Sequence, residues 1–495
     1  MKLWKKFRSL FAPIDLTKGS IYKGLIAFLV PTILSLIFQQ IYTLTDAIIV
    51  GQTLSEPAVA GVNNSSSLIF IVIYFGLGCT NGFSVVIAGA IGAKDEKRMR
   101  QSYFIQIVLC FFVSLILTVL GILFIPALLG TLGIHPSEVD LAMQTQYEAA
   151  YTYLIIIFGG TIAQVFYNMI VAVLRAMGDS FNPFLFLVFS TIANIGLDLL
   201  FIQVFHWGVA GSAWATILSQ GLAAAGAMIY AYIRYPKLRL HKEDMNFSFK
   251  EYMRHIKNGF PSGFQFSILA IGCIVMQNAI IRFDIQPDGS MLASMPAQLG
   301  YGAACKIINL LMVPYNAIGT AILAFVGQNL GAGDHKRIKQ GVWAAFWIGM
   351  VCYAITTVVG LLLTINGAYQ YLFLSPEKIN ERSIEFGNIY LYAAVPSLIL
   401  LMILILFRNA LQGLEKPLFP FLSGVGELVA RVLVCSFVPA LMNGGAITTE
   451  ATPLSFLGAA LGDPIAWIAS PLIALVPMIY YFQKLSKDDE NNRTK

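Results

Sequence analysis

Two carboxylates interrupt long apolar stretches in the first half of the chain and could bind a cation there. Asp46 lies within residues 21–50 and Asp198 within residues 183–206, and neither has an evident basic partner in the same half. An aspartate inside hydrocarbon costs about 2.5–3.5 kcal/mol on insertion scales. It must therefore be protonated, paired or bound to a cation. We expect both residues to have a function, because ionisable groups inside membrane spans rarely serve packing alone.

Amides and hydroxyls accompany both carboxylates at helical spacing. Gln39, Tyr42 and Asp46 fall close to one helix face, and Asn194 lies one turn before Asp198. Neighbouring apolar segments carry further oxygen-bearing stripes, formed by Thr161, Gln164 and Asn168 and by Ser212, Thr216 and Ser219. Such oxygen ligands suit a proton or a hard monovalent cation and not a soft transition metal. For the amides and hydroxyls, hydrogen bonding between helices is an alternative interpretation.

The second half carries a different set of charges. Glu427 and Arg431 are four residues apart in one apolar segment, which predicts an ion pair along a helix. Three interpretations stay open for Lys306: a pair with Glu427, a side chain that snorkels to the membrane surface, or a positive charge in a cavity. The histidines and six cysteines show no metal-ligand spacing, and no catalytic constellation emerges. We therefore predict a protein that is not an enzyme and has no cofactor.

These residues must be positioned by membrane-spanning helices. The chain is 57% hydrophobic and 12% charged, whereas soluble proteins carry about 25% charged residues. Its apolar runs reach the roughly 20 residues that a helix needs to cross a bilayer. We predict an all-α polytopic membrane protein with twelve spans, at residues 21–50, 58–90, 102–130, 148–174, 183–206, 208–233, 258–281, 300–328, 341–366, 388–407, 418–440 and 456–482.

The basic residues are divided unequally between the two sides of these spans. The N-terminus, the even-numbered loops and the C-terminal tail hold 27 of the 32 Lys and Arg residues, and the odd-numbered loops hold 3. The positive-inside rule then predicts a cell-membrane protein with both termini in the cytoplasm. The surplus of positive charge reports this orientation and some attraction to membrane lipids, and it gives no reason to expect a nucleic-acid partner.

The two halves of the sequence repeat each other weakly. Residues 91–98 (IGAKDEKR) are echoed by residues 330–337 (LGAGDHKR), and Pro183 is echoed by Pro420, with nearly equal shifts. The first pair predicts a helix end followed by a turn with basic residues. Because each half holds an even number of spans, the repeats enter the membrane in the same direction, as in some secondary transporters. We expect two six-helix lobes, residues 1–245 with the cation site and residues 246–495, with a substrate cleft between them.

Several motifs together resemble the multidrug and toxic compound extrusion (MATE) family. They are Pro31 followed by Asp46 and Gly51, the two loops just described, the run from Leu174 to Asp179 before Pro183, and Asn194 four residues before Asp198. The resemblance covers about residues 20 to 480. It implies export of organic cations and related drugs in exchange for sodium ions or protons, by two six-helix lobes that rock around a central cleft.

The resemblance also implies which residues bind the coupling ion. In the branch with an acidic N-terminal lobe, the matching positions are Asp46, Asn168, Asn194, Asp198 and Thr216. A second branch uses acids on spans seven and ten, where this chain has none. We assign Gln39, Tyr42, Gln164 and Lys306 to the substrate cleft, and we expect no metal beyond a sodium ion at the coupling site.

Two other functions compete with this interpretation. Flippases of lipid-linked oligosaccharides or peptidoglycan precursors belong to the same superfamily and need a cationic cavity, for which Lys306 and Arg431 are candidates. Nucleotide-driven pumping is disfavoured, because the chain contains no Gly-Lys pair and hence no phosphate-binding loop of the Walker type. We expect a monomer that exports small organic cations.

Overall fold

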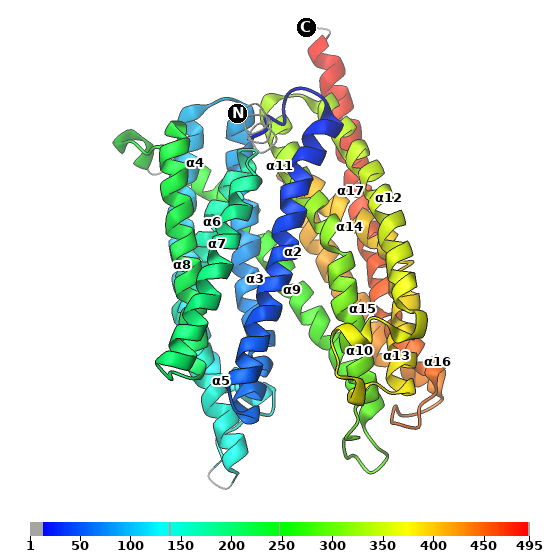
Figure 1. The fold of residues 1–495 in the computed structure, drawn as a ribbon. Coiled ribbons are helices and arrows are strands. Elements are labelled where there is room, and N and C mark those ends of the chain that lie inside the picture. The colour runs from blue at the N-terminus through cyan, green and yellow to red at the C-terminus, as the bar shows by residue number, and fades with distance from the viewer. Residues whose placement is uncertain (1–12, 138–139, 247, 494–495) are drawn as a thin grey trace, which may run out of the picture. The chain divides into compact units, whose positions relative to one another are not determined.

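The computed structural model describes residues 13–137, 140–246 and 248–493 and is built of helices. Figure 1 shows them as long, roughly aligned rods within each part of the chain. The α-helices are α2 (Ile21–Thr53), α3 (Glu56–Gly92), α4 (Glu96–Thr131), α5 (Leu141–Gly159), α6 (Thr161–Ala176), α7 (Phe181–Asp198), α8 (Val209–Arg234), α9 (Phe249–Ile281), α10 (Pro296–Leu311), α11 (Val313–Ala332), α12 (His335–Leu363), α13 (Glu381–Ala394), α14 (Leu398–Gly413), α15 (Leu418–Asn443), α16 (Pro453–Ala460) and α17 (Gly462–Arg493). In the described residues, β-structure is limited to an isolated bridge between Ile285 and Met291.

These helices account for the predicted membrane spans. In the described part of the chain, ten helical segments are long and apolar enough to cross a membrane, and two bent helix pairs raise the number to twelve. The bent pairs are α5 with α6, at 48°, and α13 with α14, at 51°. They correspond to the predicted spans 148–174 and 388–407, each the fourth span of its half. The sequence predicted each as one uninterrupted helix, and the bends are a difference from that prediction.

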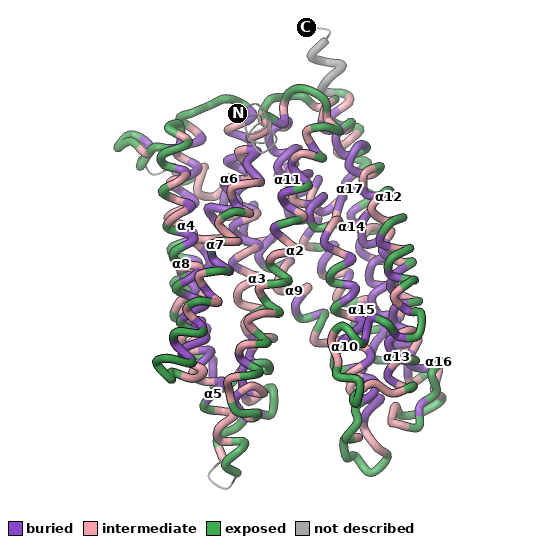
Figure 2. Tube along the Cα trace, in the orientation of Figure 1, coloured by how far each residue is buried: buried purple, intermediate pink, exposed green. Residues whose placement is uncertain are grey.

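One face of α12 shows how these helices meet their surroundings. Six large apolar side chains spaced three or four residues apart are exposed: Trp343, Trp347, Val351, Ile355, Val358 and Leu362. Figure 2 shows the exposed positions alternating with buried ones along this helix. A continuous exposed apolar stripe is unfavourable in water and is the expected surface of a helix that faces lipid.

The described residues fall into two compact units. Unit 1 takes those of Met1–Ser267, Leu323–Arg337 and Gln412–Pro417, and unit 2 takes those of Ile268–Ile322, Ile338–Leu411 and Leu418–Lys495. Short pieces from the second half of the sequence therefore pack with the first half. The division of the repeat into lobes at residues 245 and 246 stays a prediction.

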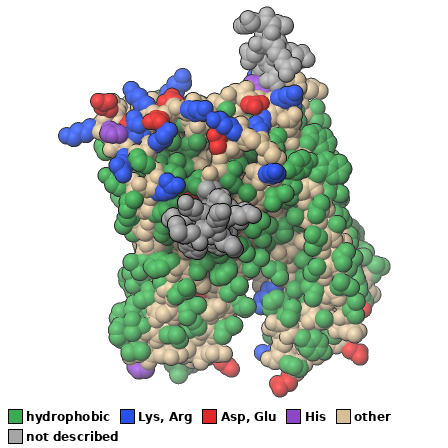
Figure 3. Space-filling model, turned by 45° about the horizontal axis from the view of Figure 1, so that its top comes forward, with side chains coloured by type: hydrophobic (Ala, Val, Ile, Leu, Met, Phe, Trp, Pro, Cys, Tyr) green, Lys and Arg blue, Asp and Glu red, His purple; other side chains and the backbone are tan. Residues whose placement is uncertain are grey.

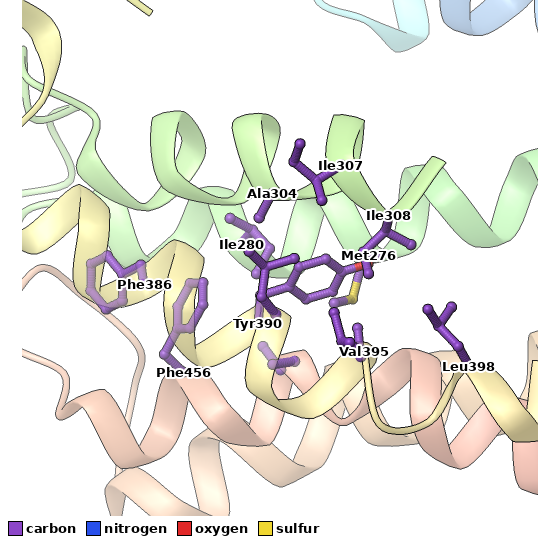
Figure 4. Packing of buried hydrophobic residues seen from close by; sticks show 14 of the residues in the cluster. Met276, Ile280, Ala304, Ile307, Ile308, Phe386, Tyr390, Val395, Leu398 and Phe456 are labelled. Atoms are coloured by element: carbon purple, nitrogen blue, oxygen red, sulfur yellow. The ribbon is translucent and has the colours of Figure 1, made fainter. Parts of the chain in front are cut away.

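Unit 2 has one large apolar core. Met276 and Ile280 on α9, Ile307 on α10, Tyr390 on α13 and Phe456 on α16 are nearly inaccessible and form part of one cluster. Figure 4 shows these side chains converging between the helices. In unit 1, α3 takes a central place, because it packs against α4, α5 and α6.

The two repeated loops have the same local geometry, and both lie in unit 1. Lys94 and Gly333 occupy equivalent positions and both have left-handed backbones, with φ of 56° and 73°. Asp95 then accepts a hydrogen bond from the backbone N–H of Arg98, at 3.0 Å, and begins α4. Asp334 does the same for Arg337 at the start of α12, at 2.9 Å. The predicted helix end, turn and basic residues are present in both copies.

Ion pairs gather at the end of unit 1 that contains these loops. Arg100 pairs with Asp244 at 2.8 Å, Lys237 pairs with Glu96 at 2.8 Å, and Arg254 pairs with Glu415. We call this region the basic end of unit 1. Figure 3 shows the blue Lys and Arg side chains concentrated there, whereas hydrophobic side chains cover the flanks.

Candidate cation site

Three packed helices of unit 1 carry most of the predicted coupling residues. Asp46 lies near the end of α2, Asn194 and Asp198 lie in the last two turns of α7, and Thr216 lies in the second turn of α8. Helix α7 packs against both α2 and α8, and α2 also contacts α8. The fold therefore brings together residues that are up to 170 positions apart in the sequence.

The helix that carries Asp198 changes its winding directly after this residue. Leu199–Val204 form a π-helical segment, in which each backbone N–H reaches back five residues and not four. The N–H of Phe205 accordingly donates to the carbonyl oxygen of Leu200, at 2.9 Å. Such π-turns are rare and are often found at functional sites, because they redirect the side chains beside them.

The two aspartates lie close enough to interact directly. The carboxyl group of Asp46 neighbours that of Asp198, and the hydroxyl of Tyr42 lies close to both and beside Thr216. Asp198 is completely buried, and Asp46 is half-buried. No Lys or Arg of the described residues interacts with either carboxyl group. Two adjacent carboxylates without a basic partner repel each other, and a shared proton or a bound cation relieves that repulsion.

Polar atoms at this site lack hydrogen-bond partners to an unusual degree. Both side-chain atoms of Asn194, both carboxyl oxygens of Asp198, and the hydroxyls of Tyr42, Ser212 and Thr216 are buried without a partner of good geometry. Buried polar groups are nearly always hydrogen-bonded in native proteins. These oxygens would suit a sodium ion or a proton with ordered water, and their donor chemistry fits the predicted coupling ion.

For the remaining predicted residues, the described ranges of the structure give no direct contact with the two aspartates. Asn168 is half-buried on α6, and within the described part of the chain no hydrogen bond joins it to either aspartate. Gln164 is buried one turn earlier on the same helix, with an unpartnered side-chain oxygen. Gln39 is exposed on α2, and Lys306 belongs to unit 2. Their assignment to the coupling site or the substrate cleft stays a prediction.

Two neighbours of the site were not among the predicted residues. Tyr153 on α5 is nearly inaccessible and interacts with Asp46, Tyr42 and Asp198. Ser212 on α8 lies beside Tyr153 and is completely buried. Ser212 belonged to a polar stripe already visible in the sequence, one turn before Thr216. Tyr153 lies among other tyrosines and apolar residues, so its spacing gave no signal.

Unit 2 holds a set of buried ion pairs of its own. The predicted ion pair between Arg431 and Glu427 is present at 3.1 Å, and Arg431 also lies 2.8 Å from Asp463 on α17. Tyr390 donates its hydroxyl hydrogen to Asp463 at 2.7 Å. The ammonium nitrogen of Lys306 lies 5.1 Å from the ring centre of Phe373. Its environment is therefore an aromatic face, and no pair with Glu427 forms.

The described residues contain no group of three or more His, Cys, Asp or Glu side chains arranged to hold a metal ion. The free cysteines among them are distributed over both units and form no disulfide.

Sequence comparisons identify the family to which the chain belongs. The MatE family profile matches residues 31–200 and 298–437, which is more than half of the chain. The "Probable multidrug resistance protein YpnP" of Bacillus subtilis is 31% identical over 328 residues, covering 66% of this chain and 68% of the relative. The "Probable multidrug resistance protein YoeA" of the same organism is 24% identical over 92% of this chain and 93% of its own length.

A solved structure shows the same architecture. An outward-facing multidrug resistance MATE transporter of the MOP superfamily superposes with a TM-score of 0.81 at 20% identity, covering 96% of this chain and 99% of the other. The predicted all-helical membrane fold is confirmed by this likeness. With its profile match and its relatives that are named multidrug resistance proteins, the chain belongs to the MatE family of efflux transporters and is not an enzyme.

Proposed function

We propose that this protein exports amphipathic, mostly cationic organic compounds in exchange for protons or sodium ions, and that Asp46 and Asp198 bind the coupling ion. The observation that supports this assignment best is the group of unpartnered oxygens around two adjacent, unpaired carboxyl groups in unit 1. The proposal places the chain in the family branch whose N-terminal lobe is acidic. Asn168, Asn194 and Thr216 complete the proposed coupling site.

The exchange follows from competition for negative charge. A coupling ion that enters from outside neutralises Asp46 and Asp198, which weakens the attraction of the same region for a cationic drug. One monovalent charge that crosses 100 mV releases about 2.3 kcal/mol, and a tenfold ion gradient adds about 1.4 kcal/mol. Export against a concentration gradient therefore needs no nucleotide.

The molecular context of this activity is part of the proposal. Residues 1–245 form the N-terminal lobe with the cation site, and residues 246–495 form the C-terminal lobe. Both termini and the basic end of unit 1 lie in the cytoplasm, in agreement with the distribution of Lys and Arg. The protein acts as a monomer in the cell membrane, in contact with its lipids.

The flippase alternative loses support from the pairing in unit 2. A pyrophosphate cargo needs basic side chains that are free to bind it. Arg431 is paired with both Glu427 and Asp463. Of the two basic residues on which that hypothesis depended, Lys306 remains, and it lies against the Phe373 ring.

The coupling assignment is tested by Asp198→Asn, which keeps the shape of the side chain and removes its charge. We expect near-normal expression and thermal stability, loss of ethidium export from a pump-deficient host, and loss of stabilisation by sodium ions or by low pH. Asp46→Asn should behave in the same way, and Glu427→Gln should affect coupling less. Asp288→Asn, in an exposed loop, is the matched control. Wild-type export with unchanged ion dependence in Asp198→Asn would show that this aspartate is structural.

A further inference from the structure

Glycines in α3 bring it into backbone contact with two helices from the second half of the sequence. A Cβ atom on Gly82 would lie 2.3 Å from the carbonyl oxygen of Asn258 on α9. A Cβ atom on Gly92 would lie 1.8 Å from the carbonyl oxygen of Gln328 on α11. No side chain larger than hydrogen fits at either distance, so α3 touches α9 and α11 along a seam that has no room for side chains. All three helical segments belong to unit 1.

The seam continues to the basic end, where Gly89 meets Gly331. A Cβ on Gly331 would lie 1.9 Å from the carbonyl oxygen of Gly89. A Cβ on Gly89 would in turn lie 3.6 Å from Oε1 of Glu415. The carboxylate of Glu415 therefore sits above the point where α3 meets α11.

Glu415 has a backbone that is unfavourable for its residue type. Its φ is +57°, in the left-handed region that disfavours residues with a Cβ atom. Its counterpart in the first half of the sequence, 237 positions earlier, is Gly178, with φ of +80°. The second half thus has a charged side chain where the first half has the residue that this backbone favours. A strained non-glycine residue points to a role for its side chain.

The partner of that side chain is Arg254 on α9. Arg254 Nε donates to Glu415 Oε2 at 2.7 Å, and Nη2 donates to the other carboxylate oxygen. Such two-pronged pairs between a guanidinium and a carboxylate are stronger and more directional than single hydrogen bonds. The two side chains are 30% and 16% exposed, so water can reach and separate them. One turn of helix away from this pair, Asn258 contacts Gly82, and Gln412 donates to Ser262 at 2.8 Å.

We propose that the Arg254–Glu415 ion pair is a latch that holds the glycine seam of α3, α9 and α11 closed at the basic end, and that it opens once in each transport cycle. This inference rests on the proposed function, because an exporter must expose its cleft to the cytoplasm to load cargo. The pair ties the loop after α14 to α9 directly over α3. Its release frees Glu415 from its left-handed backbone and lets α3 separate from the two helices.

Cys79 provides a reporter inside the seam. It lies on α3 and is completely buried, and a Cβ atom on Gly263 of α9 would lie 2.6 Å from its sulfur. A maleimide that cannot cross membranes can reach this thiol only when α3 and α9 separate. The experiment uses the full-length protein with its other five cysteines replaced by serine, in inside-out membrane vesicles.

Glu415→Gln and Arg254→Gln should each raise the rate of Cys79 labelling by about tenfold, since each removes a charge-assisted pair. Glu415→Gly should do so too, although it relieves the backbone strain, and the exchanged pair Arg254→Glu with Glu415→Arg should restore slow labelling. Glu96→Gln breaks the more exposed Lys237–Glu96 pair at the same end, which does not join α9 to the loop after α14, and should leave labelling slow.

Unchanged labelling in both Gln variants would overturn the latch. Slow labelling in Glu415→Gly would also overturn it, because backbone conformation and not the ion pair would then control the seam. Dye export is measured in parallel. If the parent protein exports no dye but Cys79 still reacts fast in the Gln variants, the latch is supported and the proposed cargo is contradicted. Failure of the latch can therefore be told apart from failure of the proposed function.

Discussion

Arg408 on α14 lies with its Nη2 atom 2.7 Å from Oε2 of Glu427 on α15, and both side chains are almost completely buried. Arg408 also donates to Ser470 on α17 at 2.7 Å. With the pairing of Arg431 to Glu427 and Asp463, this completes a network of two guanidinium and two carboxylate groups. Its formal charge is zero, and it joins α14, α15 and α17 within unit 2. The buried charges of this network compensate each other and stabilise the packing of unit 2, whereas the carboxylates of the candidate cation site in unit 1 have no basic partner among the described residues.

Neutralising one acid of this network should destabilise unit 2. Asp463→Asn leaves Arg431 with part of its charge uncompensated in a buried environment, and breaking a buried pair on one side costs about 3–5 kcal/mol. We expect a clearly lower apparent melting temperature in detergent, measured by the loss of the monodisperse chromatographic peak. Asp288→Asn in an exposed loop is the control. An unchanged melting temperature would mean that the network contributes no net stability.

The glycine seam predicts opposite effects for two helical Gly→Ala substitutions. Gly92→Ala places a methyl group 1.8 Å from the Gln328 carbonyl oxygen, so α3 and α11 must separate and the protein should lose stability or expression. Gly51 on α2 has no atom within 4 Å of an added Cβ. Gly51→Ala should therefore be neutral or stabilise by about 0.5–1 kcal/mol, through the lower entropy of the unfolded chain. Thermal unfolding of both variants tests this, and equal effects would contradict the close helix contact.

Acid should weaken the basic end through Asp244, which lies outside the predicted spans. Burial raises the pKa of this carboxyl group, but hydrogen bonds from the backbone N–H of His241 and from Arg100 hold the pKa below its ordinary value. The resulting stabilisation is complete above the unfolded pKa of about 3.9 and is lost as the pH falls through the lower folded pKa. Asp244→Asn should lower the free energy of unfolding by about 1–2 kcal/mol at neutral pH. The difference in free energy of unfolding between Asp244→Asn and the parent should shrink toward about pH 3. A difference that stays constant with pH would contradict the proposed role of the Asp244 carboxylate.

The proposed orientation predicts opposite labelling of two loop positions. Ser248 precedes α9, and Ser290 is exposed in the loop before α10. In a cysteine-free background, Ser290→Cys should react with an impermeant maleimide in intact cells, whereas Ser248→Cys should react after the membrane is opened. Reaction of both positions from outside would reject the twelve-span topology.

Sequence periodicity was sufficient to find the centre of the candidate site. The i,i+4 pair Asn194 and Asp198 and the residues Tyr42 and Asp46 of the other stripe lie together, because polar groups on apolar helices are most favourable against other helices. Gln39, which begins that stripe, is exposed. The same reasoning could not place Asn168, since half-burial on α6 is compatible with several neighbours.

The buried network of unit 2 shows where such reasoning fails. The predicted span 388–407 leaves Arg408 just outside the membrane, but α14 continues to Gly413 and buries this residue. Asp463 lay within the predicted span 456–482 and received no role, since its partner Arg431 is 32 positions away. Charges that neutralise each other across helices leave no local pattern in the sequence.

The π-helical segment after Asp198 has a consequence for how this span tolerates changes in length. Each hydrogen-bonded ring of a π-helix holds one residue more than a ring of an α-helix, so Leu199–Val204 contain a residue that ordinary winding would not need. Deleting one residue there would let the helix continue with regular pitch, and the far end would keep its position. The residues beyond the segment would also keep their facing, and the side chains within Leu199–Val204, directly after Asp198, would change direction. A one-residue deletion, which destabilises most helices, would here leave the fold intact and mainly change the binding of the coupling ion.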